Sequence, residues 1–395
     1  MGHRHVFWIA VIAVLLVALT VSGLVFARVR AGALREAWHV QIQGAGVGTL
    51  SDAVDWELIG QDAVAIRGVT GSLRIYGFDG QLRYDFKPSR GGSLASFNVA
   101  PDGGLYIGTT NNYLYAIAPD FTQRWAIHLT AARDWYVSCA VGSDGTIFAL
   151  ADRGHVYAVN ADGTIRWHST IAGVSAMGQP VLLPDDTILC RTKQLEVVAI
   201  SPQGQEKWRT ASGVAGTDEF VLSGVVVLCP RAVRQQLNAV APNGHISYSL
   251  STPIGVPLAA QQPLVAAVGD GTCYFTSEQP GGGCDLVFVD ALGHELWRVQ
   301  LKHAASSPVL LPDGRVACLL APAWDQPGAG APVFAPLLRL LQGGRDARLS
   351  VFNPYGTASV SGAANCMFSL TPLLVTPAGE LLLLDEKGYI RAFKP

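Results

Sequence analysis

The residues of this chain that could carry out chemistry are seven cysteines and nine histidines among 395 residues. Thiolates and imidazoles are common metal ligands and common catalytic groups. The histidines form no HExxH spacing, and the cysteines form neither an adjacent pair nor a CxxCH haem site. A Gly-x-Ser-x-Gly elbow and a phosphate loop are also absent from the sequence. We therefore expect no catalytic residue, no metal ligand and no cofactor.

Most of the cysteines fall in apolar stretches that predict strands, which favours buried thiols. Cys273 and Cys284 flank a glycine-rich loop and could suggest a disulfide. The repeat register described below places Cys284 opposite Gln279, about 20 Å from Cys273 at the rise of a strand. A disulfide needs Cα atoms within about 7 Å. We therefore expect these two thiols to remain unbonded.

Composition indicates many short strands joined by turns. Hydrophobic residues make up 49% of the chain and charged residues only 15%, and there are 43 glycines and 22 prolines. The net charge of −2 and the lack of a Lys/Arg-rich stripe argue against a nucleic-acid partner. Asp-Gly pairs at 79, 102, 144, 162, 270 and 313 resemble fragments of calcium loops, but their spacing favours tight turns between strands.

A repeat of 40–49 residues organises the chain. The segment from Asp144 to Trp167 alternates apolar residues and breaks at glycine turns, which predicts successive β-hairpins. A turn glycine followed four residues later by a large aromatic recurs, with Gly356 and Val360 as a degenerate copy. We expect these aromatics to lie on the outermost strand of each unit, where they cover the seam between units: Trp38, Tyr84, Trp125, Trp167, Trp208, Tyr248 and Trp297.

The two ends of the repeat region complement each other. The last unit, from Pro377, stops one strand short, whereas the segment 35–42 resembles an outer strand without a unit of its own. Pairing these two segments would remove an exposed sheet edge. We therefore predict an all-β fold: an eight-bladed β-propeller of four-stranded antiparallel blades over residues 35–395, with the last blade closed by the N-terminal strand.

This pattern resembles the repeats of quinoprotein-like propellers, also called pyrroloquinoline-quinone-like propellers. Their repeat has an alanine on the third strand, a turn glycine, and a tryptophan four residues after it. Ala158, Gly163 and Trp167 match it, as does the next unit, whereas Phe121 replaces the glycine in one unit. The paired cysteines that hold the quinone in dehydrogenases of this family are missing, so we do not expect a quinone-dependent dehydrogenase. The fold is also similar to the propeller of the outer-membrane protein assembly machinery, although the cysteine anchor of that lipoprotein is absent.

The first 34 residues divide into a tail (1–5), an uncharged apolar segment (6–27) and a linker (28–34). At 1.5 Å per residue, an apolar helix of this length would be about 33 Å long and could cross a bilayer. We expect a transmembrane anchor, with a signal sequence as the alternative. Three arginines after the segment favour a cytoplasmic propeller by the positive-inside rule. The resemblance implies instead a periplasmic or cell-surface propeller, which we prefer.

Candidate contact residues lie in loops, because function concentrates in loops on a rigid scaffold. Two neighbouring units carry insertions between their second and third strands, at 277–284 and 321–347. We expect these insertions and two charged connectors to bind a partner through Arg133, Asp134, Trp135, Asp218, Glu219, Trp324, Phe334, Leu337 and Leu338. The predicted function is a membrane-anchored, non-enzymatic protein-binding or scaffolding module. The alternative is a small-ligand sensor or an enzyme that uses the mouth of the channel.

Overall fold

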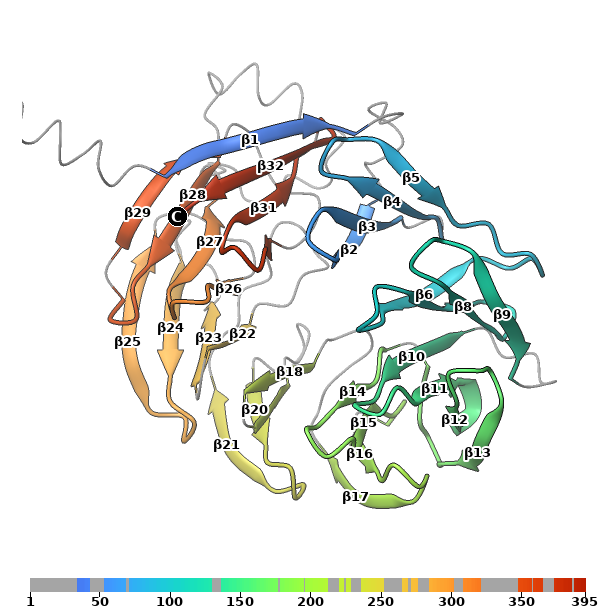
Figure 1. The fold of residues 1–395 in the computed structure, drawn as a ribbon. Helices are drawn as coiled ribbons and strands as arrows, with labels where there is room; N and C mark the ends of the chain where they lie inside the picture. The colour runs from blue at the N-terminus through green and yellow to red at the C-terminus, as the bar shows by residue number, and fades with distance from the viewer. Residues whose placement is uncertain are drawn as a thin grey trace, which may run out of the picture.

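The computed structural model describes residues 34–42, 53–68, 71–129, 136–176, 178–194, 196–211, 220–223, 225–228, 236–251, 265–268, 271–275, 284–301, 308–320, 347–356, 358–364, 373–385 and 387–395. These residues form 32 strands and one short 3-10 turn, Asp152–Gly154. The strands assemble into eight separate four-stranded sheets, each of them antiparallel (Figure 1).

The first four sheets contain consecutive strands in chain order. The first has β2 (Ala53–Ile59), β3 (Ala63–Gly68), β4 (Leu73–Gly77) and β5 (Leu82–Asp85); the second has β6 (Leu94–Val99), β7 (Leu105–Thr109), β8 (Tyr113–Ile117) and β9 (Gln123–His128). The third has β10 (Val137–Val141), β11 (Ile147–Ala151), β12 (His155–Val159) and β13 (Ile165–Thr170); the fourth has β14 (Val181–Leu182), β15 (Ile188–Arg191), β16 (Glu196–Ile200) and β17 (Glu206–Ala211).

The next three sheets repeat this order, and the eighth differs. The fifth has β18 (Phe220–Ser223), β19 (Val225–Leu228), β20 (Gln236–Val240) and β21 (Ile246–Ser251); the sixth has β22 (Val265–Val268), β23 (Gly271–Phe275), β24 (Cys284–Val289) and β25 (Glu295–Leu301). The seventh has β26 (Val309–Leu310), β27 (Val316–Leu320), β28 (Arg348–Phe352) and β29 (Ala358–Ala363). The eighth has β30 (Leu374–Val375), β31 (Leu381–Leu384) and β32 (Tyr389–Lys394), and its outer strand is β1 (Arg35–Gln41).

The alanine of the repeat makes room for the aromatic residue on the neighbouring strand. In the third sheet Ala158 lies directly opposite Trp167, and a register shift follows at Val159. The fourth sheet pairs Ala199 with Trp208 in the same way. A small residue on β12 or β16 leaves space for a large ring that faces it across the ladder. The repeat signature therefore corresponds to one cross-strand pair at a bulge.

The aromatic on the outer strand of one sheet packs against the third-to-fourth-strand turn of the following sheet. A Cβ added to Gly244, in the turn of the fifth sheet, would lie 2.6 Å from the ring of Trp208 in the fourth. The indole Nε1 of Trp208 also donates a hydrogen bond to the carbonyl oxygen of Pro242 at 2.8 Å. Trp125 and Trp167 make equivalent bonds to Ala161 and Pro202 at 2.9 Å. Each such seam is held by stacking and by a hydrogen bond, so it joins sheets that share no ladder.

Apolar side chains fill the spaces between neighbouring sheets. One cluster joins the second and third sheets through residues such as Leu114 and Val159, and another joins the third and fourth through Val156 and Val198. The junction of the eighth and first sheets is also apolar, with Trp56 and Tyr76 packed among Leu382 and Ile390. Burial of such surface stabilises by about 25 cal/mol per Å². The core of this protein is therefore distributed over the junctions between sheets.

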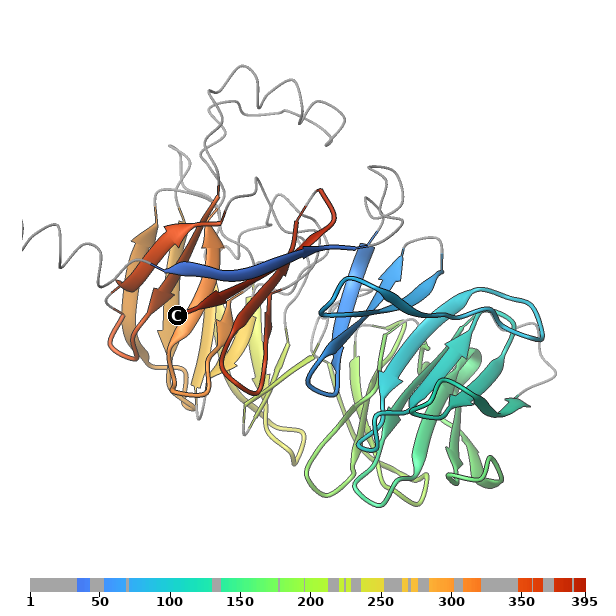
Figure 2. The same ribbon diagram turned by 45° about the horizontal axis from the view of Figure 1, so that its top comes forward.

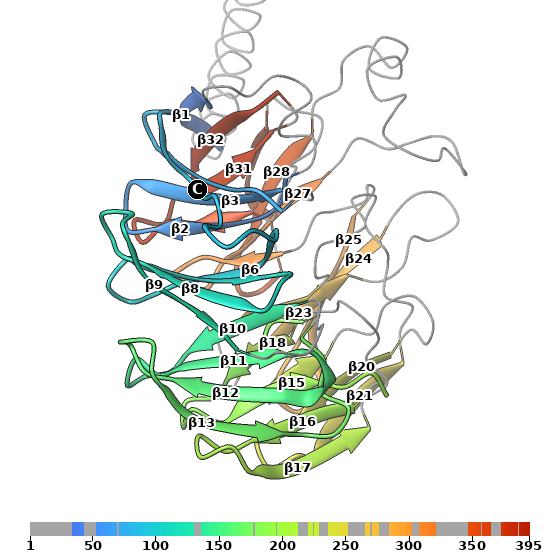
Figure 3. The ribbon, with the colours of Figure 1, turned by 90° about the vertical axis from the view of Figure 1, so that its right-hand side faces the viewer.

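The predicted closed ring requires correction. Inner strands lie against each other in two runs, one through β2, β6, β10 and β14, and the other through β18, β22, β26 and β30. Within the described residues, β14 has no comparable contact with β18, and β30 has none with β2. Figure 2 shows the two runs as separate groups of sheets, and Figure 3 shows the sheets of the first run stacked from β2 to β17. The sheets form two arcs joined by side chains, and they do not close into one even ring.

The physical reason lies at the two junctions between the arcs. The large side chains of Trp56 and Tyr76 are buried between the eighth and first sheets, so these sheets meet through side chains rather than at their inner edges. The segment that leads into β14 bonds back toward the second and third sheets, through Gln179 and Gly178. The inner edge of the fourth sheet is thereby tied to its own arc.

The transmembrane helix predicted for residues 6–27 is not observed in the described part of the chain. Among the described residues, no helix is long and apolar enough to cross a membrane. Residues 1–33, which include the expected tail, the apolar segment 6–27 and most of the linker, lie outside the described residues.

The pairing of the N-terminal strand with the last unit is observed. β1 runs antiparallel to β32, with Arg35 opposite Lys394 and Trp38 opposite Ala392. A buried ionic network crosses this pair: Arg391 Nε lies 2.8 Å from Asp385 Oδ2, and Arg391 Nη1 lies 2.9 Å from Glu36 Oε1. The Asp385 side chain is fully buried. This network fixes the register in which β1 joins the eighth sheet.

We predict that Arg391→Met destabilises the protein, because it leaves the carboxylate of Asp385 buried without its cation. The loss should be about 3–5 kcal/mol of unfolding free energy. Arg124→Met is the matched control, because Arg124 also lies 2.8 Å from a carboxylate, that of Asp102, but at an exposed site. Its loss should be about 0–1 kcal/mol. Equal losses in urea unfolding of the two variants would contradict the role of the network.

A second pair of variants tests the seams. Gly244 and Gly145 have positive φ angles of 88° and 80°, but a Cβ at Gly145 would meet nothing within 4 Å. Gly145→Ala therefore measures only the loss of unfolding free energy that comes from placing a Cβ on a residue with positive φ, about 1 kcal/mol. Gly244→Ala should cost about 1–3 kcal/mol more, because its methyl group would collide with Trp208. Similar melting temperatures for the two variants would show that the contact with Trp208 contributes little.

Candidate functional site at the inner rim of the first arc

The antiparallel sheets give the molecule two different faces. Tight turns join first to second strands and third to fourth strands, as at Gly145 and Gly163, and we call their side the turn face. The opposite side, the connector face, carries the joints between second and third strands and between successive sheets. Connectors between sheets belong to the same face as the two insertions, because strand direction alternates.

A set of polar side chains joins three sheets at the inner edge of the connector face. Ser96 Oγ, on β6, donates to Val137 O on β10 at 2.9 Å. Ser138 Oγ, on β10, donates to Gly178 O at 3.0 Å, in the segment that precedes β14. Gln179 Nε2 then donates to Phe97 O on β6 at 2.8 Å, across 82 positions of sequence. These three bonds connect the second, third and fourth sheets in a closed triangle, and we call this region the inner rim.

Two arginines belong to the inner rim. Arg67, at the end of β3, donates from Nη1 to Ala95 O at 3.3 Å and so links the first sheet to the second. Arg191, at the end of β15, is only 6% exposed. A Cβ added to Gly178 would lie 2.5 Å from Arg191 Nη2, so the segment before β14 passes directly over the guanidinium group. The inner rim therefore holds two arginines among the hydroxyl and carbonyl groups that tie neighbouring sheets together.

The residues predicted to contact a partner lie outside the described residues. Arg133, Asp134 and Trp135 belong to the connector between β9 and β10, and Asp218 and Glu219 to the connector between β17 and β18. Trp324, Phe334, Leu337 and Leu338 belong to the insertion between β27 and β28, and the shorter insertion lies between β23 and β24. Their role in binding remains a prediction.

The structure tests several of the chemical interpretations. Cys139, Cys190 and Cys318 are buried free thiols, and burial raises the pKa of Cys139 to about 12, so it is a poor nucleophile. Cys273 lies opposite Phe288, four positions from Cys284; the register differs by two residues from the predicted one, in which Cys284 faced Gln279. Aspartates of the Asp-Gly pairs cap turns: Asp144 Oδ1 accepts a hydrogen bond from Thr146 N at 2.9 Å.

The repeat aromatics occupy the outer strands. Trp125, Trp167 and Trp208 contact the next sheet as described above, and Tyr248 and Trp297 pack against Gly293 and Gly356. Tyr84 stacks on Phe121 with ring centroids 5.2 Å apart, which explains why a phenylalanine can replace the glycine there. Trp38 lies 5.2 Å from Phe78, across the junction of the eighth and first sheets.

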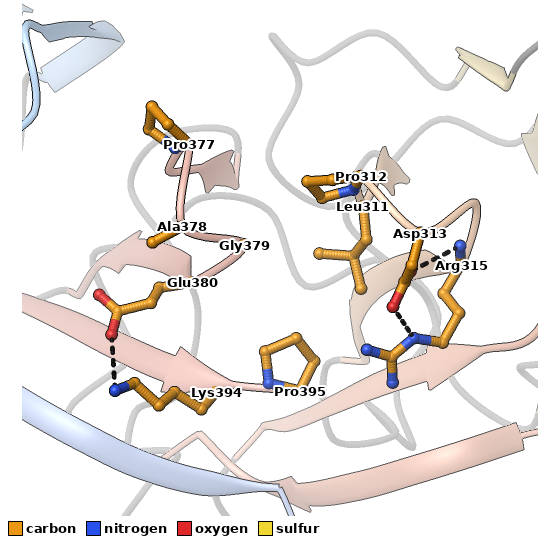
Figure 4. A pocket seen from close by; sticks show the side chains of 10 residues that line it. All are labelled: Leu311, Pro312, Asp313, Arg315, Pro377, Ala378, Gly379, Glu380, Lys394 and Pro395. Atoms are coloured by element: carbon orange, nitrogen blue, oxygen red, sulfur yellow. Dashed lines mark hydrogen bonds and ion pairs between the residues drawn. The ribbon is translucent and has the colours of Figure 1, made fainter.

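A pocket of about 430 Å³ lies on the turn face between the seventh and eighth sheets (Figure 4). Its charges are paired within the wall, because Arg315 Nε lies 2.7 Å from Asp313 Oδ2 and Lys394 Nζ lies 3.3 Å from Glu380 Oε1. The remaining lining is mainly Pro, Leu, Ala and Gly, without Ser, Cys, His or Tyr. This pocket can hold a small molecule, but its lining offers no hydroxyl, thiol or imidazole group. Sequence reasoning missed it because it forms where two distant turns meet.

In the described part of the chain, no group of three or more His, Cys, Asp and Glu side chains is placed to hold a metal ion. The repeated sheets, the aromatic seams and the polar inner rim define a propeller-type protein with quinoprotein-like repeats.

The chain belongs to the family of the outer membrane protein assembly factor BamB, whose model matches residues 35–255. This match confirms the resemblance to quinoprotein-like propellers. Among curated proteins, no sequence matches this chain.

Solved structures support the fold. BamB from Moraxella catarrhalis is similar with a TM-score of 0.58 and 14% identity, over 92% of this chain and 98% of that one. The computationally designed Ika8 protein has a TM-score of 0.58 and 10% identity, over 90% and 98% of the two chains. A streptogramin B lyase has a TM-score of 0.51 and 12% identity, over 71% and 94%. At these identities the likeness extends to the fold alone.

We predict that Gln179→Ala loosens the inner rim without unfolding the protein. Loss of the bond to Phe97 should cost about 0.5–1.5 kcal/mol. Hydrogen exchange should become faster in residues 172–180 and at β6. Gln123→Ala, which removes only an exposed bond from Ser89, is the control. Unchanged exchange in Gln179→Ala would show that the triangle does not hold this segment.

Proposed function

We propose that this chain is a non-enzymatic protein-binding propeller that serves as a scaffold, with its partner bound on the connector face. The observation that supports this most directly is the inner rim, where three sheets are tied by side-chain bonds beneath the connector face. Gln179, Ser138 and Ser96 hold the strand ends of the second, third and fourth sheets in fixed positions. Loops that project from such a rigid frame can present a partner-binding surface at low entropic cost.

The positions of the connectors support the same proposal. β9, the outer strand of the second sheet, ends at His128, and β10, the inner strand of the third, begins at Val137, so the segment with Arg133, Asp134 and Trp135 joins an outer edge to the inner rim. The segment with Asp218 and Glu219 joins the two arcs, between β17 and β18. Charged and aromatic residues at such joints are well suited to a protein interface. We propose that they form one side of the contact surface.

The insertion between β27 and β28 forms the other side of the proposed surface. Trp324, Phe334, Leu337 and Leu338 give this loop more large apolar residues than a solvated loop needs. The shorter insertion, between β23 and β24, belongs to the neighbouring sheet. We propose that the two insertions together contact the apolar part of the partner.

The family suggests the kind of partner. Because the matching family is described as an outer membrane protein assembly factor, we propose a protein partner in an assembly of this kind. The propeller would then lie outside the cytoplasm, in the periplasm or at the cell surface. We further propose that residues 6–27 attach the chain to a membrane through their apolar side chains. Alkaline extraction of membranes should retain the full chain and release a version that begins at residue 28.

A second candidate is a ligand-binding or enzymatic function at the inner rim. Lyases are among the structures with a similar fold, and Arg67 and Arg191 lie at the inner rim, although both already have partners within the protein. Replacement of both arginines by methionine would abolish such a function. It should leave a partner held by the insertions bound, although more weakly.

Site-specific photocrosslinking in native membranes distinguishes the two faces. Photoreactive residues at positions 134, 218 and 337 should capture a partner, whereas positions 162, 243 and 355, in tight turns of the turn face, should not. Replacement of residues 321–346 by a short Gly-Ser link, which keeps the buried Ala347, should remove the crosslinks from position 134 or weaken them. The melting temperature should change little, because the loop joins two strands that pair directly. Crosslinks from the turn face alone, or a large loss of stability, would contradict the proposal.

A further inference from the structure

Two histidines meet on the third sheet at a distance that suits a metal ion. Nδ1 of His155 lies 3.0 Å from Nε2 of His168. His155 is the first residue of β12, and His168 lies near the end of β13. In the ladder, His155 faces Thr170 and Tyr157 faces His168, so the two histidines are diagonal neighbours on the same side of the sheet. Sequence reasoning did not pair them, because thirteen positions separate them.

The packing around the pair fixes its geometry. The ring of Tyr157 is 4% exposed, and it stacks on His168 with centroids 4.3 Å apart and an interplanar angle of 10°. Thr170 Oγ1 lies 3.4 Å from His155 Nδ1 and adds an oxygen at the same place. A buried aromatic ring beneath His168 therefore limits its rotation while the ring itself stays accessible from solvent. Preorganised imidazoles lose less entropy when they bind a metal.

One metal ion could join the two nitrogens. At 3.0 Å they are within hydrogen-bond distance, and a metal ion would take the place of the shared proton. With metal–nitrogen bonds of about 2.0–2.1 Å, nitrogens about 3.0–3.4 Å apart suit geometries from square-planar to tetrahedral, so small changes in the side-chain torsions are sufficient. Cu(II) binds a given set of nitrogen ligands more tightly than Zn(II), and water would supply the remaining ligands.

We propose that His155 and His168 form a two-histidine site for a divalent transition-metal ion, with Cu(II) preferred over Zn(II). Neutral imidazole is the form of histidine that binds a metal ion. The site lies on the face of the third sheet toward the second, so it is separate from the pocket of the turn face. It does not depend on the proposed protein partner.

The second sheet of the same chain indicates which substitutions the fold tolerates at these two positions. In the second sheet, the positions equivalent to His155 and His168 are Tyr113 and Ala126, in the same ladder geometry. His155→Tyr and His168→Ala therefore introduce residues that the fold already accepts. His294→Ala is the control, because His294 is an exposed histidine on the sixth sheet, 3.1 Å from Asp290.

The experiment titrates the full-length protein with copper sulfate and, separately, zinc sulfate. All proteins carry His3→Ala and His5→Ala, because histidines near an N-terminus can bind Cu(II) independently. Competition with a chromophoric chelator gives the affinities. We expect one Cu(II) per chain, with zinc bound more weakly, and either single variant should bind copper roughly 10–100-fold more weakly. His294→Ala should match the reference protein.

Electron paramagnetic resonance of the copper-loaded reference protein gives a second readout that needs no variant. Coupling to two imidazole nitrogens is expected, and it should fall to one in His168→Ala. Unchanged copper affinity in both variants, a spectrum without nitrogen coupling, or an equal loss in His294→Ala would overturn the proposal. Zinc bound more tightly than copper would overturn the assignment of the metal.

Discussion

The packing of an outer-strand aromatic against the turn of the next sheet is the interaction on which the rest of this structure depends. Separate four-stranded sheets share no hydrogen-bonded ladder, so their seams are filled and held mainly by side chains. Trp208 holds the fourth and fifth sheets together in two ways. Its ring covers Gly244, and its indole N–H donates a hydrogen bond to the carbonyl oxygen of Pro242. Stacking without a hydrogen bond is also sufficient, as Tyr84 and Phe121 show. The repeat recurs in the sequence because most seams use the same small turn residue and a large ring.

Much of this architecture could be predicted from the sequence, because it depends on local spacing. The glycine and the aromatic four residues later mark the seam, and the alanine marks the position across from the ring. The pairing of β1 with β32 could also be predicted, since an incomplete unit and an orphan strand imply each other. These features follow from patterns that repeat within about 40 residues.

The arrangement of the sheets into two arcs could not be predicted in this way. It depends on single contacts, such as the bond from Gln179 to Phe97 and the burial of Trp56, which occur once and leave no repeating pattern. The candidate sites could not be predicted from the sequence for the same reason. Arg67 and Arg191 meet the inner rim only because particular strands end there, and His155 meets His168 only through the register of one hairpin. A register shift of one residue would separate that pair.

The completion of the eighth sheet by β1 also constrains the time course of biosynthesis. Glu36 and Arg391, which bond to each other, are 355 positions apart, so β1 emerges from the ribosome long before its partner strand exists. At about 5–20 residues per second, the wait lasts roughly 20–70 s. During this interval β1 is an unpaired edge, the kind of segment that promotes aggregation. Its sequence, REAWHVQ, places Arg35, Glu36 and His39 around a single tryptophan. The charges that later anchor this strand can therefore also keep it in solution while the chain is still being made.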